Sequence, residues 1–207
     1  MTDDAFQRLG AERRPWLDAA ALKARFLEQT ASLHPDRFHG APPAEKEAAT
    51  RRFAELNAAY NTLREARERL LHLLELERGS RPADIQRLPP GTMDLFVEVG
   101  QVCRDCDEFL RRQGEGTSPM LRLKHLREGL TWGDRLGSLQ QRIQARREAL
   151  DAELQGMNAA WEQAPPPGDP ARRPALPLER LEEIYRSLSY ATRWTSQVQE
   201  RVVQLAA

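Results

Sequence analysis

Cysteine, aromatic residues and net charge are all scarce in this chain of 207 residues. It has two cysteines, 6% aromatic residues, and 31 basic side chains against 31 acidic ones. Two cysteines cannot build the disulfide framework of a small secreted protein, so we expect a reducing, cytoplasmic location. A net charge of zero provides no global attraction to nucleic acid or to a membrane surface, and we expect neither as a partner.

Long apolar runs are missing as well. No stretch has the length and apolarity of a transmembrane helix, and the start at Met1 has the features of neither a secretory signal nor a transit peptide. Good helix formers dominate instead: Ala, Leu, Arg, Glu and Gln. With hydrophobic residues at 40%, the chain can still bury a core. We therefore predict an all-α protein.

Apolar residues at helical spacing predict two antiparallel helices near the start. The first stripe begins after Asp18, which can cap a helix, and stops before Pro35. The second begins at Pro43 and runs to Leu63. Two amphipathic helices joined by a short loop favour antiparallel packing. A further helix at 65–77 is rich in leucine on more than one face, so we expect it to lie between two packing partners.

Proline and glycine predict a division of the chain into two domains. Segment 79–91 is the expected linker between a domain at 1–78 and a helical bundle at 92–207. In the bundle, glycines at 129, 133 and 137 favour a short helix that ends near Leu130, before a long helix begins. The proline-rich segment 165–177 is predicted to be an extended connection, with a ligand for a proline-reading domain as the alternative.

The most informative tripeptide is His34-Pro35-Asp36, at the tip of the predicted helical hairpin. A proline after a helix fixes the local turn and leaves the flanking side chains on an exposed loop. A carboxylate there suits an arginine of a partner protein, because charge-assisted hydrogen bonds are strong. An exposed tip offers no pocket that excludes water, so we do not expect catalysis. The alternative is that the histidine and aspartate only terminate the helix and form a turn.

The residues around this tripeptide resemble a J domain, and in particular the HscB-type co-chaperones of iron–sulfur cluster assembly. The similarity lies in Phe26, in Leu33-His34-Pro35-Asp36-Arg37-Phe38 and in Leu56-Asn57-Ala58-Ala59-Tyr60-Asn61-Thr62-Leu63-Arg64. The leucine-rich helix is similar to the one that joins the J domain to a C-terminal three-helix bundle in that family. The second half is similar at 186–190 and 197–201. The resemblance implies a J domain packed on a three-helix bundle.

The resemblance implies a role in binding other proteins, with no cofactor. His34, Pro35 and Asp36 would dock on a DnaK- or HscA-type chaperone and stimulate its ATPase. Lys23 and Arg25 on the preceding helix, with Arg37 in the loop, would meet an acidic surface of the chaperone. For Lys23 and Arg25 the alternative is ordinary solvated helix charges.

The resemblance also implies a client, an iron–sulfur cluster scaffold protein, bound by the first helix of the bundle. The matching positions are Phe96, Val97, Glu98 and Val102. Gly100 and Gln101 depart from the family pattern, and bundle core is the alternative for Phe96 and Val102. Two further hypotheses are a J-domain protein with a different client and a helical adaptor without chaperone activity.

Cys103 and Cys106 form a C-x-x-C pair. Thiolates three residues apart on a helix could share a metal, but a tetrahedral site needs further ligands, and the sequence offers no paired Cys or His motif. Cys106 falls on the apolar stripe of Val102 and Phe109. We therefore favour packing over metal binding or redox chemistry, and we predict no metal site.

Overall fold

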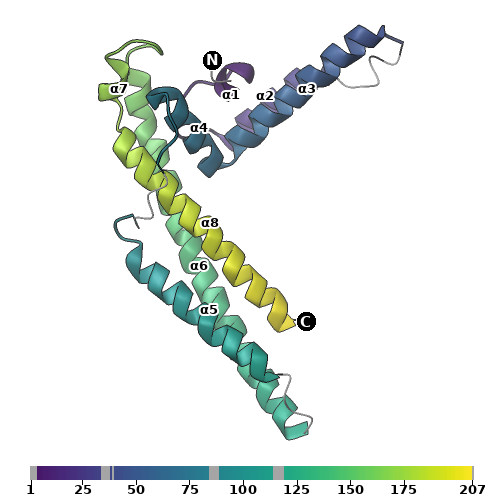
Figure 1. Cartoon of the computed structure of the whole chain (residues 1–207), viewed down its shortest axis with the longest axis vertical. Helices are drawn as coiled ribbons and strands as arrows, with labels where there is room; N and C mark the ends of the chain where they lie inside the picture. Colours follow the sequence, from purple (N-terminus) through teal and green to yellow (C-terminus); the bar gives the residue numbers. More distant parts are fainter. Residues whose placement is uncertain (1–3, 34–37, 39, 84–88, 114–118, 207) are drawn as a thin grey trace. The chain divides into compact units, whose positions relative to one another are not determined.

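A computed structural model describes residues 4–33, 38, 40–83, 89–113 and 119–206 (Figure 1). Within these ranges the secondary structure is helical and no strand occurs, which confirms the all-α prediction. Contacts divide the chain into two compact units, one of residues 1–85 with 151–185 and one of residues 86–150 with 186–207. The division into domains at 1–78 and 92–207 stays a prediction from the sequence.

The first unit begins with four helices, and the third of them packs against the other three. Along the chain they are α1 (Ala5–Arg8), α2 (Ala19–Ala31), α3 (Pro43–Arg64) and α4 (Ala66–Arg78). Both α1 and α2 pack on α3, and α3 contacts α4. Two long helices then pass through both units: α6 (Pro119–Gln163) and α8 (Leu178–Ala206). Their parts at 151–185 complete the first unit, together with the short α7 (Arg172–Ala175).

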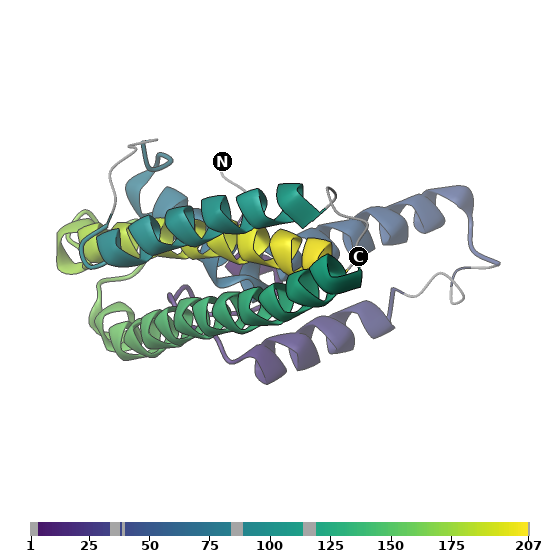
Figure 2. The same cartoon turned by 90° about the horizontal axis from the view of Figure 1, so that it is seen from below.

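The predicted hairpin is present as α2 and α3, which run antiparallel (Figure 2). The carboxylate of Asp18 accepts a hydrogen bond from the backbone N–H of Ala21 at 2.7 Å, so Asp18 is the N-cap of α2 as predicted. Proline at the first position of α3 matches the predicted start. The rings of Phe26 and Tyr60 stack with centroids 4.4 Å apart and hold the two helices together.

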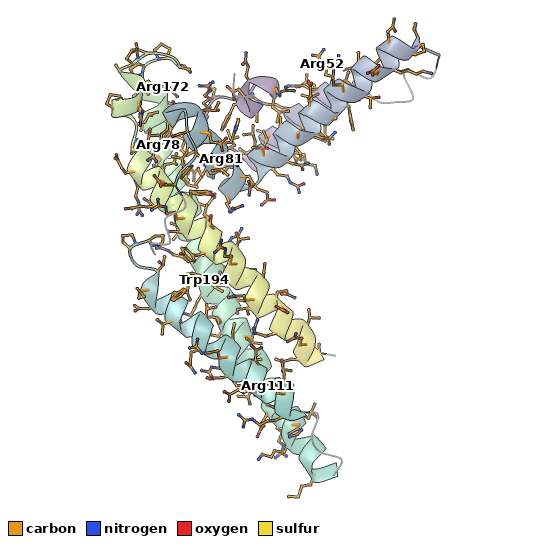
Figure 3. The ribbon with its side chains drawn as sticks, in the orientation of Figure 1. Arg52, Arg78, Arg81, Arg111, Arg172 and Trp194 are labelled. Carbon is orange, nitrogen blue, oxygen red and sulfur yellow. The ribbon has the colours of Figure 1, made fainter. Side chains whose placement is uncertain are left out.

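Helix α4 has packing partners on two sides, as its leucine content predicts. Leu70, Leu73 and Leu74 are fully buried, and α4 packs on α3. Its C-terminal end is bonded to the segment 151–185 through Glu77 and Arg78. Figure 3 labels Arg78 and Arg172, which lie where α4 approaches α7 and the start of α8.

The second unit is a bundle of α5 (Met93–Gln113) with the parts of α6 and α8 that belong to it. Its core joins side chains of all three helices, and Trp194 of α8, labelled in Figure 3, is one of them. The buried members are Val99, Val102, Cys103, Cys106, Leu136, Leu139, Ile143, Ala191, Trp194 and Val198. Helices that bury one apolar stripe each are the expected way to build such a core.

The predicted helix break near Leu130 is wrong, because α6 continues from Pro119 to Gln163. A glycine inside a helix costs about 1 kcal/mol relative to alanine, which weakens a helix without interrupting it. Tertiary packing offsets that cost here. Leu136 is fully buried, and a Cβ at Gly129 would lie 4.0 Å from the ring of Phe109. The extra short helix is therefore the first part of α6.

The predicted extended connection at 165–177 is also wrong. Pro166 accepts a hydrogen bond from the N–H of Asp169 at 3.1 Å in a turn, and α7 follows. Gly168 takes a φ of +95°, which favours glycine. The segment is compact because Arg172 is buried and bonded to Glu77 of α4.

Candidate functional site

His34, Pro35, Asp36 and Arg37 lie outside the described residues, and their predicted roles stay predictions. The structure does describe the hairpin that carries them. After α2 ends, the N–H of Leu33 donates to the carbonyl of Thr30 at 2.9 Å. Before α3 begins, the N–H of Ala41 donates to the carbonyl of Phe38 at 3.0 Å. The tripeptide is therefore in a connection between two ordered helix ends.

Lys23 and Arg25 are both exposed on α2. Lys23 makes no ion pair with any residue that the structure describes, while the guanidinium of Arg25 donates to the carbonyl of Gly10. The positive charge of both side chains remains accessible from solvent. This placement permits a contact with an acidic partner surface, and that contact stays a prediction.

Arg69 supports the base of the hairpin, a role that sequence inspection missed. This buried side chain donates to the carbonyl of Pro15 at 2.8 Å and to that of Leu63 at 2.6 Å. Burial lowers the pKa of Arg69 to about 10, although Asp151 and Glu65 oppose the shift. Arg69 is still charged at neutral pH, and it fixes the junction of α3 and α4. In the sequence, the only indication of this role was an arginine within the leucine-rich segment.

The predicted client-binding residues fall into two environments on α5. Phe96 and Val97 are 43% and 56% exposed, and the partly buried Glu98 pairs with Arg142 of α6. Val102 is only 3% exposed and belongs to the bundle core. Val102 therefore cannot present its side chain to a partner, because α6 and α8 cover it. The alternative of bundle core is wrong for Phe96.

Cys103 and Cys106 are free thiols in the core of the bundle. Burial raises the pKa of both thiols, and nearby Asp107 acts in the same direction while Arg201 opposes it. A protonated thiol is a poor nucleophile and a poor metal ligand. Among the described residues, no group of three or more His, Cys, Asp or Glu side chains could hold a metal ion. The two thiols therefore pack as small apolar groups.

We expect both cysteines to resist alkylation in the native protein. Native labelling by iodoacetamide at pH 8 should be slower than labelling in urea by on the order of a hundredfold, because it requires local opening. The folded state also raises the pKa of both thiols above the unfolded value. The free energy of unfolding should therefore fall as pH rises past about 9, because the unfolded chain then loses these protons more readily. Mass spectrometry measures the labelling. Equal rates in the two states would contradict the burial.

A cavity of about 560 Å³ in the first unit offers no free charge for a ligand. Its arginines are already paired: Arg13 with Asp4 at 2.7 Å, and Arg14 with Glu12 and Glu162. Arg172, which also lines it, is bonded to Glu77.

No helix within the described ranges combines the length and apolarity needed to cross a bilayer.

Two curated relatives match part of the chain in sequence. The chain is 37% identical over 86 residues to a co-chaperone protein HscB homolog of Cupriavidus taiwanensis, which is 42% of this chain and 47% of the relative. It is 38% identical over 61 residues to a homolog of the same name from Shewanella loihica, covering 30% and 35%. The matches thus span less than half of these curated relatives. No protein-family model matches the chain.

The fold is similar over nearly the whole chain. Chaperone HscB from Vibrio cholerae superposes with a TM-score of 0.63 at 19% identity, over 98% of this chain and 99% of that one. Human co-chaperone protein HscB superposes with a TM-score of 0.54 at 20% identity, over 98% and 81%. The predicted resemblance to HscB-type co-chaperones is confirmed. Part of the sequence is similar to theirs, and the fold is similar over nearly the whole chain.

Proposed function

We propose, from the premise that this chain resembles HscB-type J-domain co-chaperones in fold and in part of its sequence, that it stimulates the ATPase of a DnaK- or HscA-type chaperone. His34, Pro35 and Asp36 make the contact, with Lys23, Arg25 and Arg37 around them. The chain delivers a client to that chaperone, an iron–sulfur cluster scaffold protein. It performs no chemistry itself, and its cytoplasmic location stays a prediction from cysteine content.

The observation that carries this proposal is the position of the tripeptide between α2 and α3. Two antiparallel helices, tied by Phe26 and Tyr60, hold the connection that contains it. A partner can be shifted toward hydrolysis only by a ligand that binds its active state more tightly. In this proposal the imidazole of His34 and the carboxylate of Asp36 provide such a ligand.

The test is steady-state ATP turnover by a purified DnaK-type chaperone with increasing amounts of this protein. We expect turnover to rise to a plateau, since binding saturates. The protein alone, as control, should hydrolyse no ATP. Unchanged chaperone turnover at saturating protein would reject the proposed activity.

The exposed part of α5 is the proposed client surface. Phe96 and Val97 present apolar side chains to solvent, with Met93 one turn earlier and Glu98 beside them. Exposed aromatic and aliphatic side chains next to a charge are typical of a binding surface. Val102 is no longer part of this proposal, because it is buried.

Replacing Phe96 by alanine is expected to weaken scaffold binding about tenfold, since a truncated contact residue at an interface commonly costs more than 1 kcal/mol. Isothermal titration calorimetry with the scaffold protein measures this. The matched control is Leu27→Ala, at an exposed apolar residue on α2. Equal affinity for both variants and the original protein would contradict the α5 surface.

A different client is the second candidate function. Gly100 and Gln101 depart from the family pattern on the same helix, and the burial of Val102 makes the exposed patch smaller than expected. Failure of the scaffold to bind, together with intact ATPase stimulation, would favour this candidate.

A further inference from the structure

The first part of α6 exposes three leucines on one face. Leu123, Leu126 and Leu130 are 53%, 61% and 66% exposed. Another face of the same helix is covered, since the ring of Trp132 lies 6.2 Å from that of Phe109 and Leu136 is fully buried. Large aliphatic side chains exposed in a row mark an interaction surface more often than scattered single ones do.

The same face continues into two glycines. Gly133 and Gly137 follow the leucines at alternating steps of four and three residues, and Gln140 comes next. A Cβ at either glycine would meet nothing within 4 Å. This alternation is the a/d pattern of a helix that packs lengthwise on another helix. We call these six residues the α6 seam; one half consists of three leucines, and the other half begins with two glycines and ends at Gln140.

We propose that the α6 seam binds the seam of a second copy of this chain in antiparallel orientation. Reversing one copy places Leu130 over the partner's Gly133 and Leu126 over the partner's Gly137. Leu126 and Leu130 then each fill the space above a glycine, twice by symmetry. A parallel pairing would set leucine against leucine and glycine against glycine, and would leave a gap at the small half.

The charges beside the seam favour this pairing. Arg127 and Asp134 flank the seam on one side, both are exposed, and neither has an ion-pair partner in the described part of the chain. In the proposed register Arg127 lies opposite the partner's Asp134, and symmetry repeats the pair. Sliding one copy by a heptad would instead place Arg127 against the partner's Arg127, which is repulsive. Shape and charge thus select the same arrangement.

Helix α8 extends the surface at the glycine end. Gln199 of α8 accepts a hydrogen bond from Gln140 of α6 at 3.0 Å. Val203, one helical turn beyond Gln199, is exposed. Helices α6 and α8 run antiparallel (Figure 2), so from the Gln140–Gln199 bond the next turn of α8, which holds Val203, runs back along α6 toward Gly137. The partner's leucine half would therefore meet an apolar edge there.

A seam of this length predicts a weak, reversible dimer, because one short helix pair buries less surface than a stable interface. Sedimentation equilibrium of the full chain, up to about 100 μM, should show a monomer–dimer equilibrium. Leu126→Glu should abolish it. Leu27→Glu, at an exposed leucine on α2, should leave it unchanged. Circular dichroism checks that both variants fold.

Charge exchange tests the register. Arg127→Asp and Asp134→Arg should each weaken the dimer at least about tenfold, since two attractive pairs become repulsive. Combining them should restore the original affinity. A monomer at every concentration, or a double variant as weak as the single ones, would overturn the proposal. These outcomes are independent of chaperone stimulation.

Discussion

Replacing Asp36 by asparagine is expected to raise the concentration of this protein needed for half-maximal stimulation of the chaperone ATPase roughly ten- to a hundredfold. The amide keeps the size of the side chain but removes the charge that an arginine of the chaperone would meet. A hydrogen bond to a charged group contributes about 1.5–3 kcal/mol, so the affinity should fall by roughly ten- to a hundredfold. Steady-state ATP turnover, measured over the same range of co-chaperone concentration, tests this expectation.

The matched control is Glu148→Gln, which makes the same chemical change at an exposed position of α6. It should stimulate as well as the original protein. Because Asp36 is in the connection between α2 and α3, neither change should alter the helical circular dichroism spectrum. An unchanged half-maximal concentration for the Asp36 variant would mean that the tripeptide is not the contact with the chaperone.

Replacing Arg172 by alanine should lower the free energy of unfolding by about 3–5 kcal/mol, because it leaves a buried carboxylate without its counter-ion. Arg172 and Glu77 are 7% and 3% exposed and share two hydrogen bonds of 2.8 Å. Arg172 also donates to the carbonyl of Pro165 at 2.7 Å. Urea denaturation, followed by circular dichroism, measures the loss.

Arg173→Ala is the matched control, since this neighbouring arginine is exposed. Its effect should stay within about 0.5 kcal/mol. The double variant Arg172→Met with Glu77→Leu should recover much of the loss, because it removes both charges together. An Arg172→Ala protein as stable as the control would show that the ion pair contributes little.

The helices were predictable wherever the pattern is local. The N-cap Asp18, the proline at the first position of α3 and the apolar stripes are all recognisable from neighbouring residues, and they predict α2 and α3 correctly. The break near Leu130 was a wrong prediction for the opposite reason. Glycine lowers helix propensity locally, while α6 is stabilised by contacts with residues far away in the chain, such as Phe109.

The candidate site shows the same limit. His34, Pro35 and Asp36 are contiguous, so the tripeptide could be found by reading the chain. Val102 was misassigned because its burial depends on Leu136 and Trp194, which only the folded bundle brings next to it. The bonds of Arg69 and Arg172 were missed because their partners are 54 and 95 residues away.

The interleaving of residues 1–85 with 151–185 has a consequence for protein engineering. A fragment that stops after α4 would leave Glu77 without Arg172, and it would remove the bonds of Arg78 to Leu178 and Glu182. We therefore do not expect the segment from α1 to α4 to keep its structure when it is separated from the rest of its unit. Grafting it onto another protein would require transplanting α7 and the adjoining ends of α6 and α8 as well.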